Sequence, residues 1–264
     1  MIDIHSHVIW EVDDGASSFE ESLAMLRVSA EDGVTDIVAT PHCNQQYMYD
    51  AQKVAERITE LTGGEGHPKI HRGCEFHLRF DTLDLLLESP ATFTINASRY
   101  LLLECPDFHI GKHTEAILQR LLDTGIVPIL AHPERNPTLQ KDLGRLERWV
   151  DLGCLSQVTS LSITGGFGGQ ARSAATKILE RGLAHVVASD AHDPEYRAPR
   201  LSEAREVIRR AHGEDTADLL FSHNPGCVIK NLPVAGGKLI GEGPPSRRWW
   251  PFQILGGLKI SRGN

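Results

Sequence analysis

Residues 1–7 read Met1-Ile2-Asp3-Ile4-His5-Ser6-His7, an apolar strand pattern that ends in two histidines. Because alternate side chains of a β-strand share a face, His5 and His7 point the same way and can bind one metal ion from a rigid edge. The pair alone is weak evidence, since two histidines on one strand face are often only polar surface residues. The residues that end the other strands decide between these interpretations.

Six more apolar segments follow His7 at intervals of about thirty residues, and amphipathic segments separate them. We predict strands over residues 35–40, 69–74, 100–103, 127–131, 155–161 and 184–189. We predict helices from Ser17 or Ser18 to residue 32, and near residues 50–61, 82–88, 114–123, 141–152, 170–181, 201–211 and 215–221. Repeated strand–helix units indicate a parallel sheet covered by helices, and seven units predict a closed or nearly closed α/β barrel.

Six of the seven predicted strands end at a residue type that binds metals. These residues are His5 and His7, His42, Glu75, Glu104, His132, and Asp190 with His192. The carboxyl ends of all strands meet at one mouth of an α/β barrel, where active sites are built. We therefore predict a multinuclear metal site there, to which the carboxylate-rich turn at residues 11–15 could bend back.

Composition excludes several other classes of protein. The 264 residues carry 35 acidic and 27 basic side chains, a net charge of −8, which disfavours nucleic acid as a partner. No apolar run approaches about 18 residues, so we expect a cytoplasmic protein. The five cysteines have no paired spacing, which favours reduced thiols, and none begins the C-x5-R loop of thiol-based phosphatases.

Other candidate residues have simpler interpretations. We expect surface or rim positions for the histidines off the strand ends, which are His67, His71, His77, His109, His113, His185, His212 and His223. Cys43, Cys74 and Cys105 each follow or precede a proposed ligand, and neighbours in a strand face opposite ways, so we expect them to pack outward against helices. Residues 165–169 lack the phosphate-binding fingerprint and are expected to form a mobile rim loop.

With these residues assembled, the chain resembles the PHP (polymerase and histidinol phosphatase) superfamily. Within it, the chain is most similar to the bacterial protein-tyrosine phosphatases of capsule and exopolysaccharide gene clusters. The matching motifs are Asp3-Ile4-His5-Ser6-His7 with Asp13-Asp14-Gly15, Ala39-Thr40-Pro41-His42, Gly73-Cys74-Glu75, Leu103-Glu104, Ala131-His132-Pro133-Glu134-Arg135 and Ala188-Ser189-Asp190-Ala191-His192. The likeness covers residues 1–232 and implies a distorted (β/α)7 barrel of the PHP type.

The resemblance also implies three divalent cations, with manganese as the metal, although histidine and carboxylate donors equally suit iron, cobalt or zinc. His5, His7, Glu75 and Asp190 would bind the first cation. Glu75 would bridge to a second, which Glu104 and His132 would complete. The third would take His42, His192 and a carboxylate of the Asp-Asp-Gly turn, for which we choose Asp14 over Asp13. Thr159-Ser160 stands where relatives carry an asparagine, which leaves the contribution of that strand open.

The implied activity is metal-dependent hydrolysis of phosphotyrosine in a partner protein, and the resemblance implies a bacterial tyrosine kinase as that partner. Arg135 and Arg197 would bind the phosphoryl oxygens at the rim, because a planar guanidinium matches two oxygens. One alternative is a small-molecule phosphatase, such as a histidinol phosphatase. Another is a metal-stabilised interaction domain without activity. The sequence leaves the oligomeric state open.

Residues 233–264 differ in composition from the rest of the chain. They are rich in glycine and proline, carry five basic residues against one acidic residue, and show no helical or strand period. We therefore predict a flexible tail. Its segment Arg247-Arg248-Trp249-Trp250-Pro251-Phe252 could contact an anionic membrane or a kinase, and a solvated tail is the simpler expectation.

Overall fold

The structure, a computed structural model, describes residues 1–62, 64, 66–79, 82–106 and 110–236. Within these ranges, nine strand segments form two parallel sheets, in the orders β1-β2-β4 and β3-β5-β6-β7-β8-β9. The segments are β1 (Ile2–Ser6), β2 (Asp36–Ala39), β3 (His42–Cys43), β4 (Lys69–Arg72), β5 (Glu75–His77), β6 (Tyr100–Glu104), β7 (Val127–Ala131), β8 (Leu155–Thr159) and β9 (Val186–Ala188).

The nine segments correspond to seven strands, because two strands are each interrupted once. Thr40-Pro41 separates β2 from β3, and Gly73-Cys74 separates β4 from β5. Pro41 has no N–H to donate to a neighbouring strand, which explains the first break. Hydrogen bonding continues past it, since Gly73 N–H donates to Ala39 O (2.9 Å) and Glu75 N–H to Pro41 O (3.0 Å).

The barrel closes between its last and first strands. Ser6 and Ala191 form a parallel bridge, Asp190 N–H donates to His5 O (2.9 Å), and His7 N–H donates to Ala191 O (2.8 Å). The buried carboxylate of Asp3 reinforces this seam by accepting from the backbone N–H (3.0 Å) and the hydroxyl (2.5 Å) of Ser189. The predicted seven-stranded α/β barrel is therefore confirmed.

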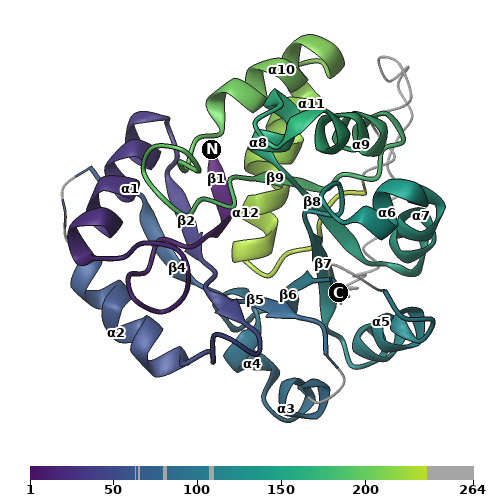
Figure 1. Cartoon of the computed structure of the whole chain (residues 1–264), viewed down its shortest axis with the longest axis horizontal. Coiled ribbons are helices and arrows are strands. Elements are labelled where there is room, and N and C mark those ends of the chain that lie inside the picture. Colours follow the sequence, from purple (N-terminus) through teal and green to yellow (C-terminus); the bar gives the residue numbers. More distant parts are fainter. Residues whose placement is uncertain (63, 65, 80–81, 107–109, 237–264) are drawn as a thin grey trace, which may run out of the picture.

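Most of the helices lie around this ring of strands in Figure 1, whereas α12 lies across its centre. They are α1 (Phe19–Glu31), α2 (Ala51–Leu61), α3 (Leu83–Glu88), α4 (Pro90–Phe93), α5 (Thr114–Asp123), α6 (Pro137–Lys141), α7 (Leu143–Leu152), α8 (Ser160–Thr164), α9 (Gly168–Glu180), α10 (Ser202–His212), α11 (Glu214–Asp218) and α12 (Asn224–Ile229), with short helical turns at Ile95–Ala97 and Leu219–His223. Ser18 and Asp50 cap α1 and α2 with their side-chain oxygens, as their positions in the sequence predict.

One helix, α12, closes the amino-terminal end of the barrel. Its Val228 packs in the same buried cluster as Ile4, Val38 and Ile129 of the strands. Asn224 also donates to the backbone oxygen of His185 (2.8 Å). α12 therefore covers the end of the barrel opposite to the strand ends that carry the predicted ligands.

Several predicted elements differ from the structure. The strand predicted over residues 155–161 ends at Thr159, and α8 starts at Ser160, because the chain turns sharply where the Glu134 carboxylate accepts the Thr159 N–H (3.0 Å). The loop expected at residues 165–169 is a tight turn that leads into α9, which starts at Gly168. His185 is buried rather than at the surface, and burial lowers its pKa to about 4.

Predictions about the tail and His109 fall largely outside the described residues, which exclude 107–109 and 237–264. Cys74 and Cys105 are buried in the cluster between strands and helices, as expected, and Cys43 packs against it. Among the described helices, none combines the length and the hydropathy needed to cross a bilayer.

Candidate metal centre

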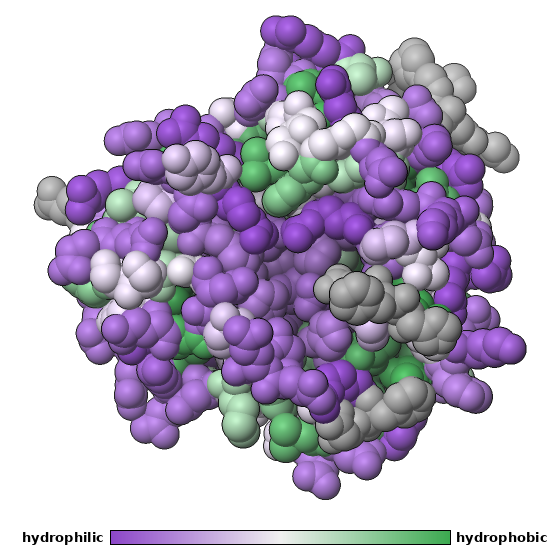
Figure 2. Space-filling view, in the orientation of Figure 1, coloured by the Kyte–Doolittle hydropathy of each residue, from purple (hydrophilic) through white to green (hydrophobic). Residues whose placement is uncertain are grey.

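The nine predicted ligands gather at the carboxyl ends of the strands. Groups of their donor atoms lie within 4.8 Å of one another, and the groups are His5-His7-Glu75, His42-Glu75-Glu104 and His7-Asp14-His42-His192. His132 and Asp190 join these groups through Glu75, His5 and His7, as described below. Figure 2 shows hydrophilic side chains around a hollow at the centre of this face.

In the first group, the Nε2 atoms of His5 and His7 face each other. His5 Nδ1 lies 2.9 Å from the amide oxygen of Gln157, and His7 Nδ1 lies 2.6 Å from Asp13 Oδ2. Both partners are acceptors, so each Nδ1 donates a proton outward, and each Nε2 can bind a cation that displaces any proton it carries. The two Nε2 atoms are only 3.3 Å apart. Asp190 Oδ1 lies 3.3 Å from His5 Nε2, so the atoms converge as ligands of one cation do.

Glu75 stands at the middle of the site. Its Oε1 lies 2.8 Å from His132 Nε2, and its Oε2 lies 2.9 Å from His42 Nδ1. Glu75 Oε2 and His42 Nδ1 are both buried. Although they lie close together, they form no hydrogen bond with each other or with any other described residue. Burial would raise the pKa of Glu75, but the neighbouring imidazoles, His5 foremost, hold it well below its ordinary value. A buried anion beside an unsatisfied imidazole nitrogen fits a shared cation.

The turn after β1 supplies two carboxylates with different partners. Asp14 Oδ1 lies 3.3 Å from His42 Nε2 and 3.5 Å from His192 Nε2, and hydrogen bonds from these two histidines lower the pKa of Asp14. Asp13 is already occupied, since it accepts from His7 Nδ1, from His42 N–H (3.0 Å) and from Gly15 N–H (3.0 Å). The geometry thus places Asp14 among the donors and Asp13 behind them.

Gly15 lets this turn approach β1 closely. A Cβ at this position would lie 2.1 Å from the His7 backbone oxygen and 2.5 Å from its Cβ. We expect Gly15→Ala to push the turn away from His7, lowering the free energy of unfolding by about 1–3 kcal/mol and weakening metal binding. Thermal melting and metal titration test this. Gly169→Ala, where a Cβ meets nothing within 4 Å, is the control and should behave as wild type.

Two arginines lie beside Asp190. Arg135 Nη1 donates to Asp190 Oδ2, and Arg197 Nη2 donates to the same oxygen at 2.7 Å and to the Asp190 backbone oxygen at 3.1 Å. Their side chains are 30% and 28% exposed, so both guanidinium groups reach the mouth while remaining attached to the site. Two positively charged guanidinium groups share one carboxylate oxygen here, so their other N–H groups can bind a second anion.

Two of the predicted ligands adopt strained backbone conformations. His132 has φ of 32° and Asp190 has φ of 53°, in the left-handed region that residues with a Cβ rarely occupy. His132 directly follows β7, and Asp190 lies two residues after β9. Strain of this kind concentrates at functional sites, where the surrounding structure holds it in place.

The sequence alone did not identify the residues that orient the histidines. Gln157, on β8, holds His5 through its amide oxygen and is fully buried, so the strand with Thr159-Ser160 does contribute a polar contact, two residues earlier than expected. His77 was assigned to the rim, and its Nδ1 lies 2.9 Å from Glu104 Oε2. A polar residue within an otherwise buried strand was the available signal for Gln157.

A pH dependence follows from the protonated state of the metal-free site. Asp13 outweighs burial and raises the pKa of His7 to about 9, and Asp14 and Glu75 do the same for His42, to about 11. Their stabilising contribution is complete below the unfolded value of about 6.5 and is lost as pH rises through these folded values. We expect the chelated protein to melt at lower temperature at pH 9 than at pH 6.5.

Metal-loaded protein should show a different trend, because cations displace these protons and therefore bind more tightly as pH rises. The gain in melting temperature on metal addition should be larger at pH 9 than at pH 6.5. An equal gain at both values would contradict the assignment of these histidines as ligands.

Comparison with known proteins agrees with this geometry. The family model described as capsular polysaccharide synthesis, CpsB/CapC, matches residues 1–230. The chain belongs to this family. The tyrosine-protein phosphatase CpsB of Streptococcus pneumoniae is 35% identical over 87% of this chain and 98% of its own length. The tyrosine-protein phosphatase YwqE of Bacillus subtilis is 30% identical over 89% of this chain and 93% of its own.

Solved structures of other proteins share the fold of this CpsB/CapC member. One match comes from the crystal structures of YwqE from Bacillus subtilis and CpsB from Streptococcus pneumoniae, which are described as metal-dependent tyrosine phosphatases. Its TM-score is 0.84 at 29% identity, over 90% of this chain and 98% of that one. A β-aspartyl dipeptidase from Fervidobacterium islandicum matches with a TM-score of 0.56 at 15% identity, which shows a shared barrel fold only. The family predicted from the sequence motifs is thereby confirmed.

Donor chemistry and family membership together indicate that this CpsB/CapC protein binds metal ions. The donors are histidine nitrogens and carboxylate oxygens, most of them buried, and the outer nitrogens of His5 and His7 are fixed by Gln157 and Asp13. Such outer partners orient and strengthen metal-binding histidines. The residues present therefore fit divalent transition-metal cations.

Proposed function

We propose that this CpsB/CapC protein is a metal-dependent protein-tyrosine phosphatase. The observation that carries the proposal is the convergence of nine histidine and carboxylate donors at one barrel mouth, with two arginines attached to Asp190 beside them. Two relatives that share most of this chain are named tyrosine-protein phosphatases.

The site would hold three divalent cations. His5, His7, Glu75 and Asp190 would bind the first. Glu75, Glu104 and His132 would bind the second, with His42 Nδ1 also within reach of Glu75. Asp14, His42 and His192 would bind the third. Manganese suits this mixture of donors, as do iron and zinc. When bound, the ions would neutralise charge on the phosphoryl oxygens and lower the pKa of the attacking water.

The protein's own residues would bind and orient the phosphate. In hydrolysis, a water oxygen bonds to phosphorus and gives up one proton, the bond from phosphorus to the tyrosine oxygen breaks, and that oxygen takes up a proton. The products are tyrosine and inorganic phosphate. Arg135 and Arg197 would donate to phosphoryl oxygens that become more negative as the ester bond breaks. Their present partner, Asp190 Oδ2, shows that both can donate to a single anionic group.

The proposed substrate is a phosphotyrosine protein, specifically a bacterial tyrosine kinase that regulates capsule or exopolysaccharide synthesis. The link to capsule synthesis rests on the family to which the chain belongs, and the kinase on the resemblance of the sequence motifs. We propose a cytoplasmic location, and a barrel over residues 1–232 followed by a separate tail. A homo-oligomer is compatible with this proposal.

The test is phosphate release by purified, manganese-loaded protein. We expect turnover of phosphotyrosyl peptides and little turnover of histidinol phosphate. The reverse preference would favour the small-molecule phosphatase. Full metal loading with no turnover of either substrate would favour the non-catalytic interaction domain. Elemental analysis of the same sample measures the number and identity of the metals.

A further inference from the structure

We propose that Phe167 is a positioning residue that holds both arginines of the phosphate-binding pair in place. Its ring contacts the two guanidinium groups at once, with the Cζ atoms of Arg135 and Arg197 at 4.5 and 5.5 Å from the ring centroid. The inference rests on the proposed function, which assigns phosphate binding to these two arginines.

The two arginines need such a support because their charges repel. Both guanidinium groups donate to Oδ2 of Asp190. They cannot take one carboxylate oxygen each, because Oδ1 faces His5 and His7. The face of an aromatic ring attracts a guanidinium group electrostatically and allows it to stack flat. Both guanidinium groups are therefore held by two residues, through hydrogen bonds to Asp190 and through contact with the ring of Phe167.

The backbone around Phe167 is built to present this ring. Gly165 has φ of 99° and ends α8, and Gly168 N–H donates to Gly165 O at 2.9 Å, closing a four-residue turn. Phe167 has φ of −94° and ψ of 16°, the values of the third position of a type I turn. A hydrogen-bonded turn, rather than a mobile loop, thus sets the direction of the ring.

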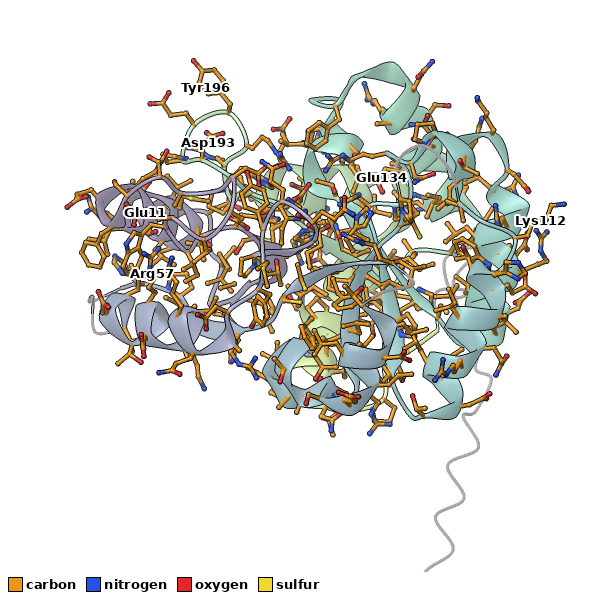
Figure 3. The ribbon with its side chains drawn as sticks, turned by 60° about the horizontal axis from the view of Figure 1, so that its bottom comes forward. Glu11, Arg57, Lys112, Glu134, Asp193 and Tyr196 are labelled. Atoms are coloured by element: carbon orange, nitrogen blue, oxygen red, sulfur yellow. The ribbon has the colours of Figure 1, made fainter. Side chains whose placement is uncertain are left out.

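The turn is attached to the metal centre through α8. Glu134 is fully buried, and its Oε1 accepts from Thr159 N–H (3.0 Å) and from the Ser162 hydroxyl (2.7 Å), the first turn of α8. Figure 3 shows Glu134 among the packed side chains, whereas Tyr196 and Lys112 project outward. Glu134 lies between His132 and Arg135 in sequence, so one loop supplies a ligand, an arginine and the anchor of the Phe167 turn.

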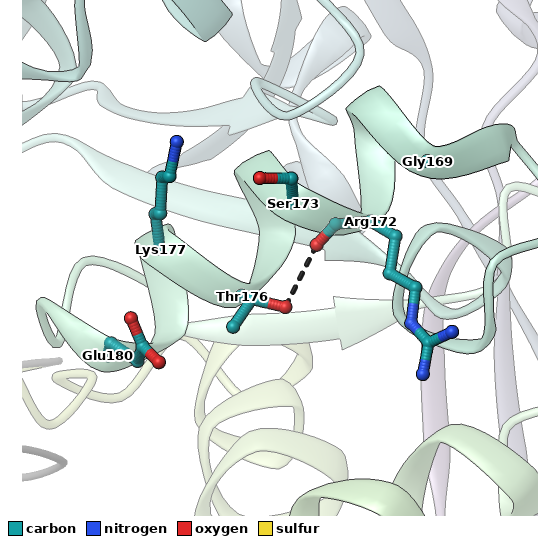
Figure 4. Close-up of a pocket in the computed structure, with 6 residues that line it drawn as sticks. All are labelled: Gly169, Arg172, Ser173, Thr176, Lys177 and Glu180. Atoms are coloured by element: carbon teal, nitrogen blue, oxygen red, sulfur yellow. Dashed lines mark hydrogen bonds between the residues drawn. The ribbon is translucent and has the colours of Figure 1, made fainter.

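A neighbouring hollow does not share this role. About 380 Å³ in volume, it lies on the outer face of α9 and is lined by exposed residues of that helix alone, from Gly169 to Glu180 (Figure 4). The one hydrogen bond drawn among its lining residues runs within the helix, from the Thr176 hydroxyl to Arg172 O at 2.9 Å. Neither Phe167 nor either arginine of the pair lines this hollow, and neither do the predicted ligands.

The test compares Phe167→Leu, which removes the aromatic face, with Phe167→Tyr, which keeps it. The probe is inorganic phosphate, whose dissociation constant for manganese-loaded protein is measured by calorimetry. We expect Phe167→Leu to raise this constant and the KM for a phosphotyrosyl peptide by about tenfold, with a smaller change in kcat. Phe167→Tyr should stay close to wild type. Metal content and melting temperature should match wild type in both.

Inorganic phosphate has no aromatic ring, which separates this inference from direct stacking on the tyrosine of the substrate. If Phe167→Leu raises the peptide KM but leaves phosphate binding unchanged, the ring contacts substrate and the positioning role is wrong. The role is also wrong if Phe167→Leu still weakens phosphate binding when both arginines are alanine. Phe167→Met, of similar length, replaces Phe167→Leu if the latter fails to fold.

The same measurements separate this inference from the proposed function. Phosphate binding that depends on Phe167, in a protein that does not hydrolyse phosphotyrosyl peptides, would overturn the proposed activity and leave the positioning role in place. Normal hydrolysis of phosphotyrosyl peptides, with phosphate binding that Phe167→Leu does not change, would support the proposed activity and overturn the positioning role.

Discussion

Glu75→Gln is expected to lower kcat/KM for phosphotyrosyl peptides by about 10³-fold or more. Glu75 is fully buried, and its two oxygens approach His132 and His42 within 3 Å. Glutamine has the same shape but no negative charge, and its NH₂ group cannot bind a metal. Because Glu75 would serve two cations, its replacement should reduce metal content as well as turnover.

The measurement combines steady-state kinetics with elemental analysis of the same preparation. The control is Glu88→Gln, an exposed residue at the end of α3, which should retain full activity and metal content. A Glu75→Gln protein that holds its full complement of metal and turns over at the wild-type rate would remove Glu75 from the site.

Arg135→Ala and Arg197→Ala are each expected to lower kcat/KM by about 10²-fold while leaving metal content unchanged. The guanidinium groups donate to Asp190 and are partly exposed at the mouth, so their loss removes donors to phosphate without removing a ligand. Lysine should rescue neither variant well, because an ammonium group cannot form two parallel hydrogen bonds or stack on Phe167.

The double variant should lose less than the product of the two single effects, since both arginines act on the same oxygen and ring. Arg210→Ala, which removes an exposed arginine paired with Glu206 on α10, is the matched control. Loss of metal from either site variant, together with loss of turnover, would indicate that the arginines act by stabilising Asp190 and not by binding phosphate.

Much of this molecule follows from regularities along the chain. Strand positions were predictable because buried parallel strands are short, apolar and separated by amphipathic helices at a nearly constant interval. The end of the barrel that carries the site was predictable, because parallel strands in a barrel bring all their carboxyl ends to one mouth. These two rules were enough to bring together His5, His42, Glu104 and Asp190, which are remote in sequence.

Other features depend on contacts that no local pattern contains. Asp13 and Asp14 are adjacent and chemically identical, and only the approach of the turn to His7, which Gly15 allows, determines which carboxylate faces the donors. The glycine-rich stretch at residues 165–169 indicated a loop, whereas the structure has a turn that leads into α9. The turn follows α8, whose start is held by Glu134 from a different loop, a contact that the local sequence does not contain.

By itself, the sequence predicted the barrel, its family and the set of histidines and carboxylates that meet at the mouth, because periodicity and strand ends are properties of the chain. Only the tertiary structure decided which atoms meet, namely Gln157 with His5, Asp13 behind His7, and Phe167 beneath both arginines. Such pairings form between side chains brought together from separate strands and turns, so their geometry exists only once the barrel has closed.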